Sequence, residues 1–98
     1  MLDSQNQYAY NRCILYFSIH AIKRMGERNI SEQEVFELLS LEEAVMVSPS
    51  ARDDSIDLCL GHVNGKYWLV IINRITKTVI TVRPMRDKEI ERYKDYVK

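Results

Sequence analysis

A histidine and two arginines recur every four residues near the start of the chain, as His20, Arg24 and Arg28. Residues four apart lie on one face of a helix, so the three side chains form one stripe if this segment is helical. An imidazole that moves a proton beside guanidiniums that stabilise charge suits a reaction with an anionic transition state. The alternative is a solvated helix face with a local ion pair to Glu27, and spacing alone favours that interpretation.

The charge of the chain is zero overall but unevenly distributed along the sequence. Residues 31–43 hold five acidic side chains and no basic one, whereas residues 58–86 hold five basic side chains and no acidic one. A neutral total can therefore contain a basic face that attracts a polyanion. Alternatively, the acidic and basic elements pack beside each other and neutralise locally.

The basic segment supplies a second set of candidate residues. Guanidiniums match phosphate oxygens in a bidentate way, so Arg74 and Arg83 are candidates for holding phosphates. Trp68 is suited to stacking on a base, and Thr81 to a hydrogen bond with a phosphate or ribose. The structural alternatives are an ion pair of Arg74 with Asp57 and a core position for Trp68. The candidate substrate-binding residues are Trp68, Thr81, Lys66 and Arg86.

The sequence predicts neither a metal site nor a cofactor site. Two histidines and two cysteines, each pair far apart, provide no standard ligand set. No Gly-rich phosphate loop or nucleophile elbow is recognisable. Cys13 and Cys59 are expected to be free buried thiols, which suits the reducing cytoplasm. A polar N-terminus and short apolar runs predict neither a secretion signal nor a membrane span.

Two short helices joined by a tight corner are expected in the first half of this single 98-residue domain, after a loose polar arm at 1–10. Ser18 is a good N-cap for a helix over 19–28. Asn29 can adopt the left-handed conformation that ends a helix. Ser31 and Glu34 then form a capping box for the second helix, which carries Val35, Leu38 and Leu39.

An antiparallel meander and a last helix are expected in the second half. Asn64-Gly65 is a strong hairpin signal and pairs Val63 with Lys66. A second two-residue turn near Thr76-Lys77 would pair Val70 with Arg83. The predicted strands are 56–63, 66–75 and 78–85, after a short strand or extended segment at 12–17 and an ambiguous Ala44–Val47, and a helix capped by Asp87 follows over 88–97.

This register sorts the strand residues into two faces. One face is wholly aliphatic and is expected to meet the helices; it consists of Leu58, Leu60, Leu69, Ile71, Ile80 and Val82. The other is part apolar and part cationic and is expected to form a shallow site; it consists of Asp57, Cys59, Trp68, Val70, Ile72, Arg74, Thr81 and Arg83. The helix stripe joins that site only if it reaches the edge of the sheet.

Two segments resemble a known superfamily. Ser18-x-His20-Ala21-x-x-Arg24-Met25-x-x-Arg28-x-Ile30-Ser31-x-x-x-Val35 resembles the opening of small bacterial domains related to the RelE/ParE toxins. The pattern from Gly65 to Arg86, followed by Glu89-x-x-x-Tyr93, is similar to the BrnT branch. Together the two matches cover roughly residues 13–95.

The resemblance implies an α+β fold with two N-terminal helices on a small antiparallel sheet and a C-terminal helix. It also implies a cytoplasmic ribonuclease toxin of a type II toxin–antitoxin pair, which acts without metal or cofactor. In such enzymes a ribose 2′-hydroxyl attacks the adjacent phosphate. Its partners would be an RNA substrate and a cognate antitoxin, with no membrane. The residues that match are His20, Arg24, Arg28, Arg74 and Arg83.

Two other functions remain open at this stage. The zero net charge favours a non-catalytic module on the same fold that binds nucleic acid or a protein. A poison of a protein target, as in the ParE branch, is the third interpretation. Trp68 and the mixed sheet face would also serve self-association of the chain into a homo-oligomer.

Overall fold

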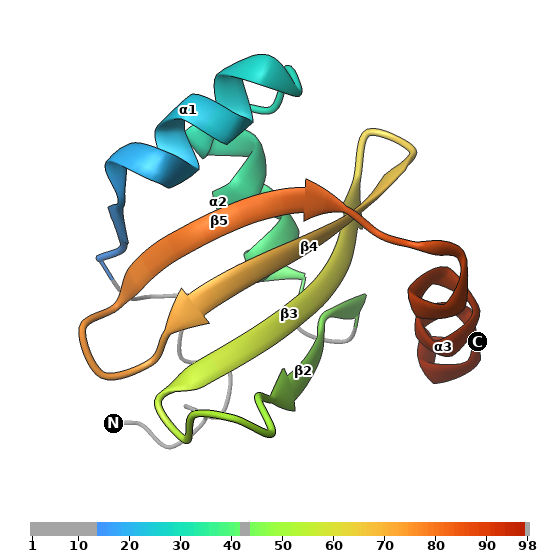
Figure 1. The fold of residues 1–98 in the computed structure, drawn as a ribbon. Coiled ribbons are helices and arrows are strands. Elements are labelled where there is room, and N and C mark those ends of the chain that lie inside the picture. The colour runs from blue at the N-terminus through green and yellow to red at the C-terminus, as the bar shows by residue number, and fades with distance from the viewer. Residues whose placement is uncertain (1–13, 42–43, 98) are drawn as a thin grey trace.

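The computed structural model describes residues 14–41 and 44–97, which form three helices and a five-stranded sheet (Figure 1). The protein is therefore α+β, as predicted. The expected arm at 1–10 and Cys13 lie outside the described residues. The elements in chain order are β1 (Tyr16–Phe17), α1 (Ile19–Glu27), α2 (Glu32–Ser40), β2 (Met46–Pro49), β3 (Ile56–Val63), β4 (Lys66–Asn73), β5 (Thr78–Pro84) and α3 (Asp87–Val97).

The sheet has the strand order β1-β5-β4-β3-β2. The predicted meander β3-β4-β5 forms its centre, and the ambiguous segment supplies β2, which pairs antiparallel with β3. The prediction of a wholly antiparallel sheet is wrong at one edge, where the two-residue β1 runs parallel to β5. Because β1 pairs only with Thr78 and Val79, the rest of β5 has no neighbouring strand on its outer side among the described residues.

The two N-terminal helices begin at the residues that the sequence indicates, and α1 ends at Glu27, one residue before the expected end. The Oγ of Ser18 accepts a hydrogen bond from the Ala21 N–H, and Ser31 and Glu34 form the predicted capping box. The corner between the helices is a Schellman motif: the Ile30 N–H donates to the Met25 carbonyl oxygen, and Asn29 has a φ of 58°. This local chemistry holds the end of α1 in one conformation.

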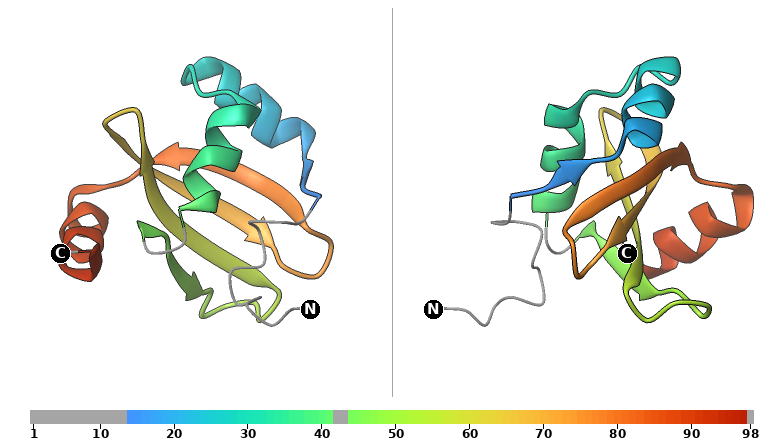
Figure 2. Two further views of the ribbon diagram at one scale, coloured as in Figure 1. Left: turned by 180° about the vertical axis from the view of Figure 1, so that it is seen from behind. Right: turned by 60° about the vertical axis from the view of Figure 1, so that its left-hand side comes forward.

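Helices cover the two faces of the sheet from opposite sides (Figure 2). α1 and α2 pack on one face over a core that includes Val35, Leu38, Val70 and Val82. On the other face, α3 contributes Tyr93 to a smaller cluster. That second cluster also contains Leu60, Leu69 and Met85, with Leu58, Ile71 and Ile90 partly buried against it.

The first predicted hairpin is confirmed, and the second is wrong, because its turn has four residues and not two. Asn64 and Gly65 both have positive φ, and Val63 pairs with Lys66 as expected. The β4–β5 connection, however, takes four residues, 74–77. The side chain of Asn73 builds it, because its Oδ1 accepts hydrogen bonds from the backbone N–H groups of residues 75 and 76.

The longer turn moves the pairing of β5 by two residues, which keeps each side chain on its face, and the irregularity in the strand pairing then changes the face of the residues beyond it. Val70 pairs with Val82, not with Arg83, and the register also shifts between Ile71 and Ile72. Val82 therefore shares the face of Val70 beneath α1 and α2. The assignment of the two faces is also reversed, since the aliphatic Leu60 and Leu69 lie with α3.

The mixed face is thus the main core of the molecule and no shallow site. Trp68, Val70, Ile72 and Cys59 are buried on it, and the Trp68 residue is only 5% exposed. The reason is that both faces of this sheet are covered, so hydrophobicity alone does not tell which face takes which helix.

None of the helices in the described segments is long and apolar enough to cross a membrane.

Candidate functional site

A cleft of about 520 Å³ opens where four elements end near one another. The last residues of α1 and the corner after it form one wall, and the start of α3 forms the opposite wall. The beginning of β4 and the end of β5 lie between them, on the side of the molecule where Figure 1 shows α3 beside the end of the sheet. The cleft is lined by Glu27, Arg28, Asn29, Lys66, Tyr67, Trp68, Pro84, Met85 and Ile90.

Arg28 is held at this cleft by the backbone of β5. Its Nη1 donates a hydrogen bond of 2.6 Å to the carbonyl oxygen of Val82. That oxygen lies on the stretch of β5 that has no neighbouring strand, so the arginine covers an open sheet edge. One of five guanidinium N–H donors is used in this way, and the others remain for an anion in the cleft. The helix stripe therefore does reach the edge of the sheet.

Lys66 brings a second positive charge to the cleft from the first position of β4. Its side chain is exposed. A carboxylate lies near it: the backbone N–H of Ser31, the side chain of Asn64 and the charge of Lys66 together hold the pKa of Glu34 below its ordinary value. Asn64 donates a short hydrogen bond to that carboxylate. The hairpin tip is thereby tied to the start of α2.

Arg83 is engaged in an ion pair with the last helix. Its two terminal nitrogens donate to the two carboxylate oxygens of Glu89 at 2.9 and 2.8 Å. These hydrogen bonds hold the pKa of Glu89 below its ordinary value. Arg83 also donates to the Pro84 carbonyl oxygen, two residues along β5 from the carbonyl that Arg28 caps. The arginine thus fixes the start of α3, which forms one wall of the cleft.

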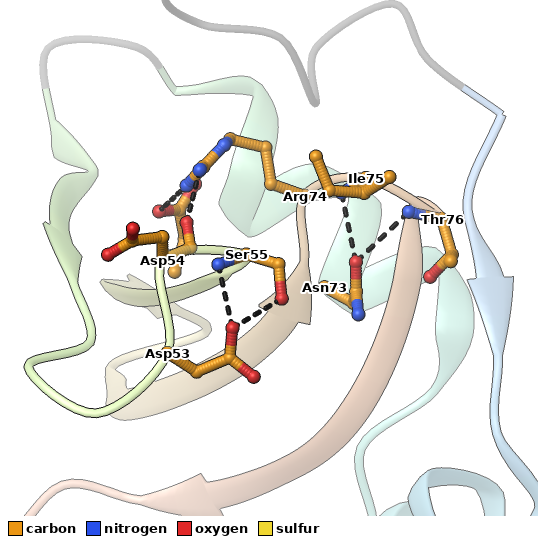
Figure 3. Close-up of polar contacts among 8 residues, drawn as sticks. Asp53, Asp54, Ser55, Asn73, Arg74, Ile75 and Thr76 are labelled. Carbon is orange, nitrogen blue, oxygen red and sulfur yellow. Dashed lines mark hydrogen bonds and ion pairs between the residues drawn. The ribbon is translucent and has the colours of Figure 1, made fainter.

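Arg74 lies at the opposite end of the sheet from the cleft. It follows the last residue of β4, whereas Lys66 begins that strand, and eight strand residues span about 25 Å. Its guanidinium donates to Asp57 Oδ1 at 3.0 Å and to the backbone carbonyl oxygen of Asp54 (Figure 3). Asp57 is a buried carboxylate, 7% exposed. The structural alternative for Arg74, the ion pair with Asp57, is the arrangement observed.

The other two stripe residues do not line the cleft. His20 lies in the first turn of α1, is exposed, and makes no hydrogen bond with any described side chain or backbone group. Arg24 is half-buried and pairs with Glu27 at 3.1 Å. The predicted local ion pair on this helix is therefore formed, and Glu27 itself is one of the residues that line the cleft.

The remaining candidates are divided between the cleft and other places. Trp68 contributes to the cleft floor from its core position, so its ring is not a free stacking platform. Thr81 pairs across the sheet with Ile71, on the face that carries α3. Arg86 is exposed just before α3, where its backbone N–H donates to the Glu89 carboxylate.

A second histidine, which is not among the candidates from the sequence, lies on the α3 side of the sheet near the cleft. His62 Nδ1 is 2.7 Å from the hydroxyl oxygen of Tyr93, and that hydroxyl donates to the Ala44 carbonyl oxygen at 2.6 Å. Because the hydroxyl proton is used for Ala44, the His62 Nδ1–H is the donor to Tyr93. Tyr67, a cleft residue, packs against both rings. In the sequence, the predicted Asn64-Gly65 hairpin is the one feature that places His62 beside Tyr67.

Metal ligands do not gather anywhere in residues 14–41 and 44–97: no group of three or more His, Cys, Asp or Glu side chains is placed to hold an ion. The cleft itself combines one carboxylate, one anchored guanidinium and one ammonium with tyrosine and amide side chains. Such a set can bind a phosphodiester and can accept a proton from a bound hydroxyl.

Residues 17–83 match the family described as a domain of unknown function, DUF4258. The chain belongs to the DUF4258 family. The match begins in β1 and ends at Arg83, so it contains α1, the Schellman corner and the cleft residues of β4, but not Pro84 or Met85. It does not include α3, and the cleft wall around Ile90 is therefore outside the matched range of this DUF4258 protein.

Comparison with curated proteins and with solved structures finds no match for the chain.

Proposed function

We propose that this DUF4258 protein binds single-stranded RNA in the cleft and cleaves it without a metal ion, as the toxin of a toxin–antitoxin pair. The observation that carries the proposal is the position of Arg28, which the Val82 carbonyl holds at the cleft that Lys66 also lines. A guanidinium fixed in advance loses little entropy when it binds a phosphate, and its fork matches two phosphate oxygens. Tyr67 adds an aromatic surface beside the two charges.

The proposed reaction is an attack of a ribose 2′-hydroxyl on the adjacent phosphorus. Glu27 accepts the proton of that hydroxyl, and Arg28 and Lys66 stabilise the charge that develops on the phosphoryl oxygens. The bond to the 5′-oxygen breaks, that oxygen takes a proton from water, and the products are a 2′,3′-cyclic phosphate and a 5′-hydroxyl. Glu27 replaces His20 in the base role because it lines the cleft and His20 does not.

A cleavage assay with purified protein tests the proposal. Labelled single-stranded RNA is incubated with the protein in EDTA, and the ends of the fragments are identified. We expect cyclic phosphate ends, and a loss of rate of about 10²–10⁴-fold in Glu27→Gln. Lys23→Ala is the matched control for Lys66→Ala, since Lys23 is an exposed lysine of α1 that does not line the cleft. His20→Ala tests whether His20, the base that the sequence suggests, contributes to the rate of cleavage.

RNA that stays intact, together with harmless expression of the chain without a partner, would refute the toxin proposal. A second function then takes its place, a non-catalytic module that binds nucleic acid. The observation that favours it is that Arg74 and Arg83 are both held in ion pairs and do not join Arg28 and Lys66 in lining the cleft. Binding without cleavage, weakened by salt with a slope of about −1.4 for two phosphate contacts, would support this module.

In the toxin interpretation, the antitoxin neutralises the protein by covering the same cleft with acidic or polar groups. A partner gene product that suppresses toxicity is then expected to protect Lys66 from acetylation by a water-soluble reagent. Protection of Lys23 alone, at a position outside the cleft, would contradict this mode of neutralisation.

A further inference from the structure

The corner between α1 and α2 presents a side chain to the cleft that the proposed reaction does not use. Asn29 lies between Arg28 and the buried Ile30, and it lines the cleft. Its side chain is exposed, and its amide makes no hydrogen bond with the described part of the chain. An asparagine amide offers both a donor and an acceptor, side by side.

The backbone beneath this amide is rigid. In the Schellman motif, the N–H groups of Asn29 and Ile30 donate to the carbonyl oxygens of Gly26 and Met25. Met25 and Ile30 are both buried in the main core, which is the apolar contact that accompanies this motif. Since Met25 and Ile30 are both buried, the backbone of Asn29 is held in one conformation at the edge of the cleft.

The left-handed backbone at position 29 does not by itself require an asparagine side chain. Asn29 has a φ of 58°, a conformation that glycine adopts with less strain than asparagine. Glycine would therefore end the helix as well, without placing an amide beside Arg28. The second asparagine with positive φ, Asn64, uses its amide for the carboxylate of Glu34. The amide of Asn29 has no such internal use among the described residues.

We propose that Asn29 reads an adenine base of the RNA in the cleft, so that the site prefers adenine over the other bases. The inference rests on the proposed function, since it requires that the cleft binds RNA. An asparagine amide pairs in a bidentate way with N6 and N7 of adenine. Bases of single-stranded RNA expose these edges, which are hidden in a duplex groove. Arg28 beside it fixes the phosphate, which sets the register of the base.

The pairing edges of the bases distinguish adenine from cytosine as well. Adenine presents its amino group beside a ring acceptor on two edges, whereas cytosine does so on one.

Binding of short 2′-O-methyl oligonucleotides tests the inference, because they lack the attacking hydroxyl and are not cleaved. A labelled uridine octamer is compared by fluorescence anisotropy with octamers in which one central base is adenine, cytosine or guanine. We expect the adenine octamer to bind on the order of tenfold more tightly than the uridine octamer, as one bidentate pair confers.

Asn29→Gly removes the amide and keeps the left-handed backbone, so the variant should remain folded by thermal melting. We expect it to bind all four octamers with equal affinity, close to that of wild type for uridine. Asn64→Gly is the matched control, the same substitution at a left-handed turn outside the cleft, and should retain the preference for adenine.

The outcomes separate the inference from the proposed function. If no octamer binds wild type, the RNA-binding proposal fails and the inference fails with it. If the octamers bind in a salt-dependent way but without a preference for adenine, only the inference is overturned. A preference for adenine that survives in Asn29→Gly would overturn it equally, since another group would then read the base.

Discussion

Replacing Gly61 with alanine should disturb the contact that brings α2 onto the sheet. Gly61 lies in β3, and a Cβ built on it would be 2.6 Å from Cδ2 and 2.8 Å from Cγ of Leu38. Leu38 is completely buried in the main core, so it has no free space to move into. Overpacking of this kind destabilises by about 1–3 kcal/mol. For a domain of this size, that lowers the melting temperature by roughly 4–8 °C for each kcal/mol.

Gly26→Ala is the matched control, because it makes the same chemical change in the opposite environment. A Cβ on Gly26 meets no atom within 4 Å, and the residue lies inside α1. Alanine is the better helix former there by about 0.5–1 kcal/mol, so this variant should be more stable than wild type. Thermal unfolding followed by circular dichroism measures both variants under one condition.

The double variant Gly61→Ala with Leu38→Ala tests whether this contact is the cause. Leu38→Ala alone should cost about 2–5 kcal/mol, through lost burial and a cavity beside the sheet. In the double variant the new methyl group occupies part of that cavity, so the loss should be smaller than the sum of the single losses by at least 1 kcal/mol. Strict additivity, or a Gly61→Ala variant as stable as wild type, would refute the packing argument.

Three further outcomes follow from the charges and the buried thiol. Arg74→Met should lower the free energy of unfolding by about 1–2 kcal/mol, because Asp57 is buried while Arg74 is 41% exposed. The variant should cleave RNA as wild type does. Loss of cleavage in a folded variant would show that Arg74 is catalytic. Glu89→Gln should be less stable than wild type at pH 7, measured by urea unfolding. Since the ion pair lowers the Glu89 pKa from its ordinary value of 4.5, this stabilising effect is fully present above pH 4.5 and is lost as the pH falls below it. A difference in stability between wild type and Glu89→Gln that persists at pH 3 would contradict a role of the ion pair. Burial raises the pKa of the Cys59 thiol to about 12, so peptide mapping after iodoacetamide treatment at pH 8 should find Cys59 unmodified in the native protein and alkylated in urea.

Arg83 illustrates how one side chain fits two interpretations until its partners are known. As a basic residue at the end of a strand it is a reasonable phosphate ligand, and its bidentate pair with Glu89 uses the same fork geometry that a phosphate would. The partner lies six residues later, at the start of α3. The sequence contains both residues, but it does not show that the chain turns back to bring them together.

The site was predictable in part. Arg28 was a candidate from its spacing, and Lys66 and Trp68 from their residue types, and all three line the cleft. The sequence assigned Glu27 only a local ion pair and Asn29 only the end of a helix. In the structure both residues also line the cleft. His20 was the leading base by spacing, yet a nine-residue helix is about 13 Å long, so its first turn and its last residue cannot meet the same phosphate.

The features that the sequence by itself determined are those that depend on neighbours along the chain. The N-cap Ser18, the capping box of Ser31 and Glu34, and the Asn64-Gly65 turn each satisfy backbone groups within a few residues. Their energies do not depend on the rest of the fold, so residue type and spacing predict them. The α+β class follows from the order of these elements.

Tertiary structure alone decided which sheet face meets which helices and which residues share the cleft. Both faces carry apolar side chains, so burial favours either arrangement, and for β5 the outcome depends on the one extra residue at its register shift. A shift of one residue in a strand moves each side chain to the other face. The cleft, in turn, forms where α1, β4, β5 and α3 end near one another, and that meeting depends on the packing of the whole chain.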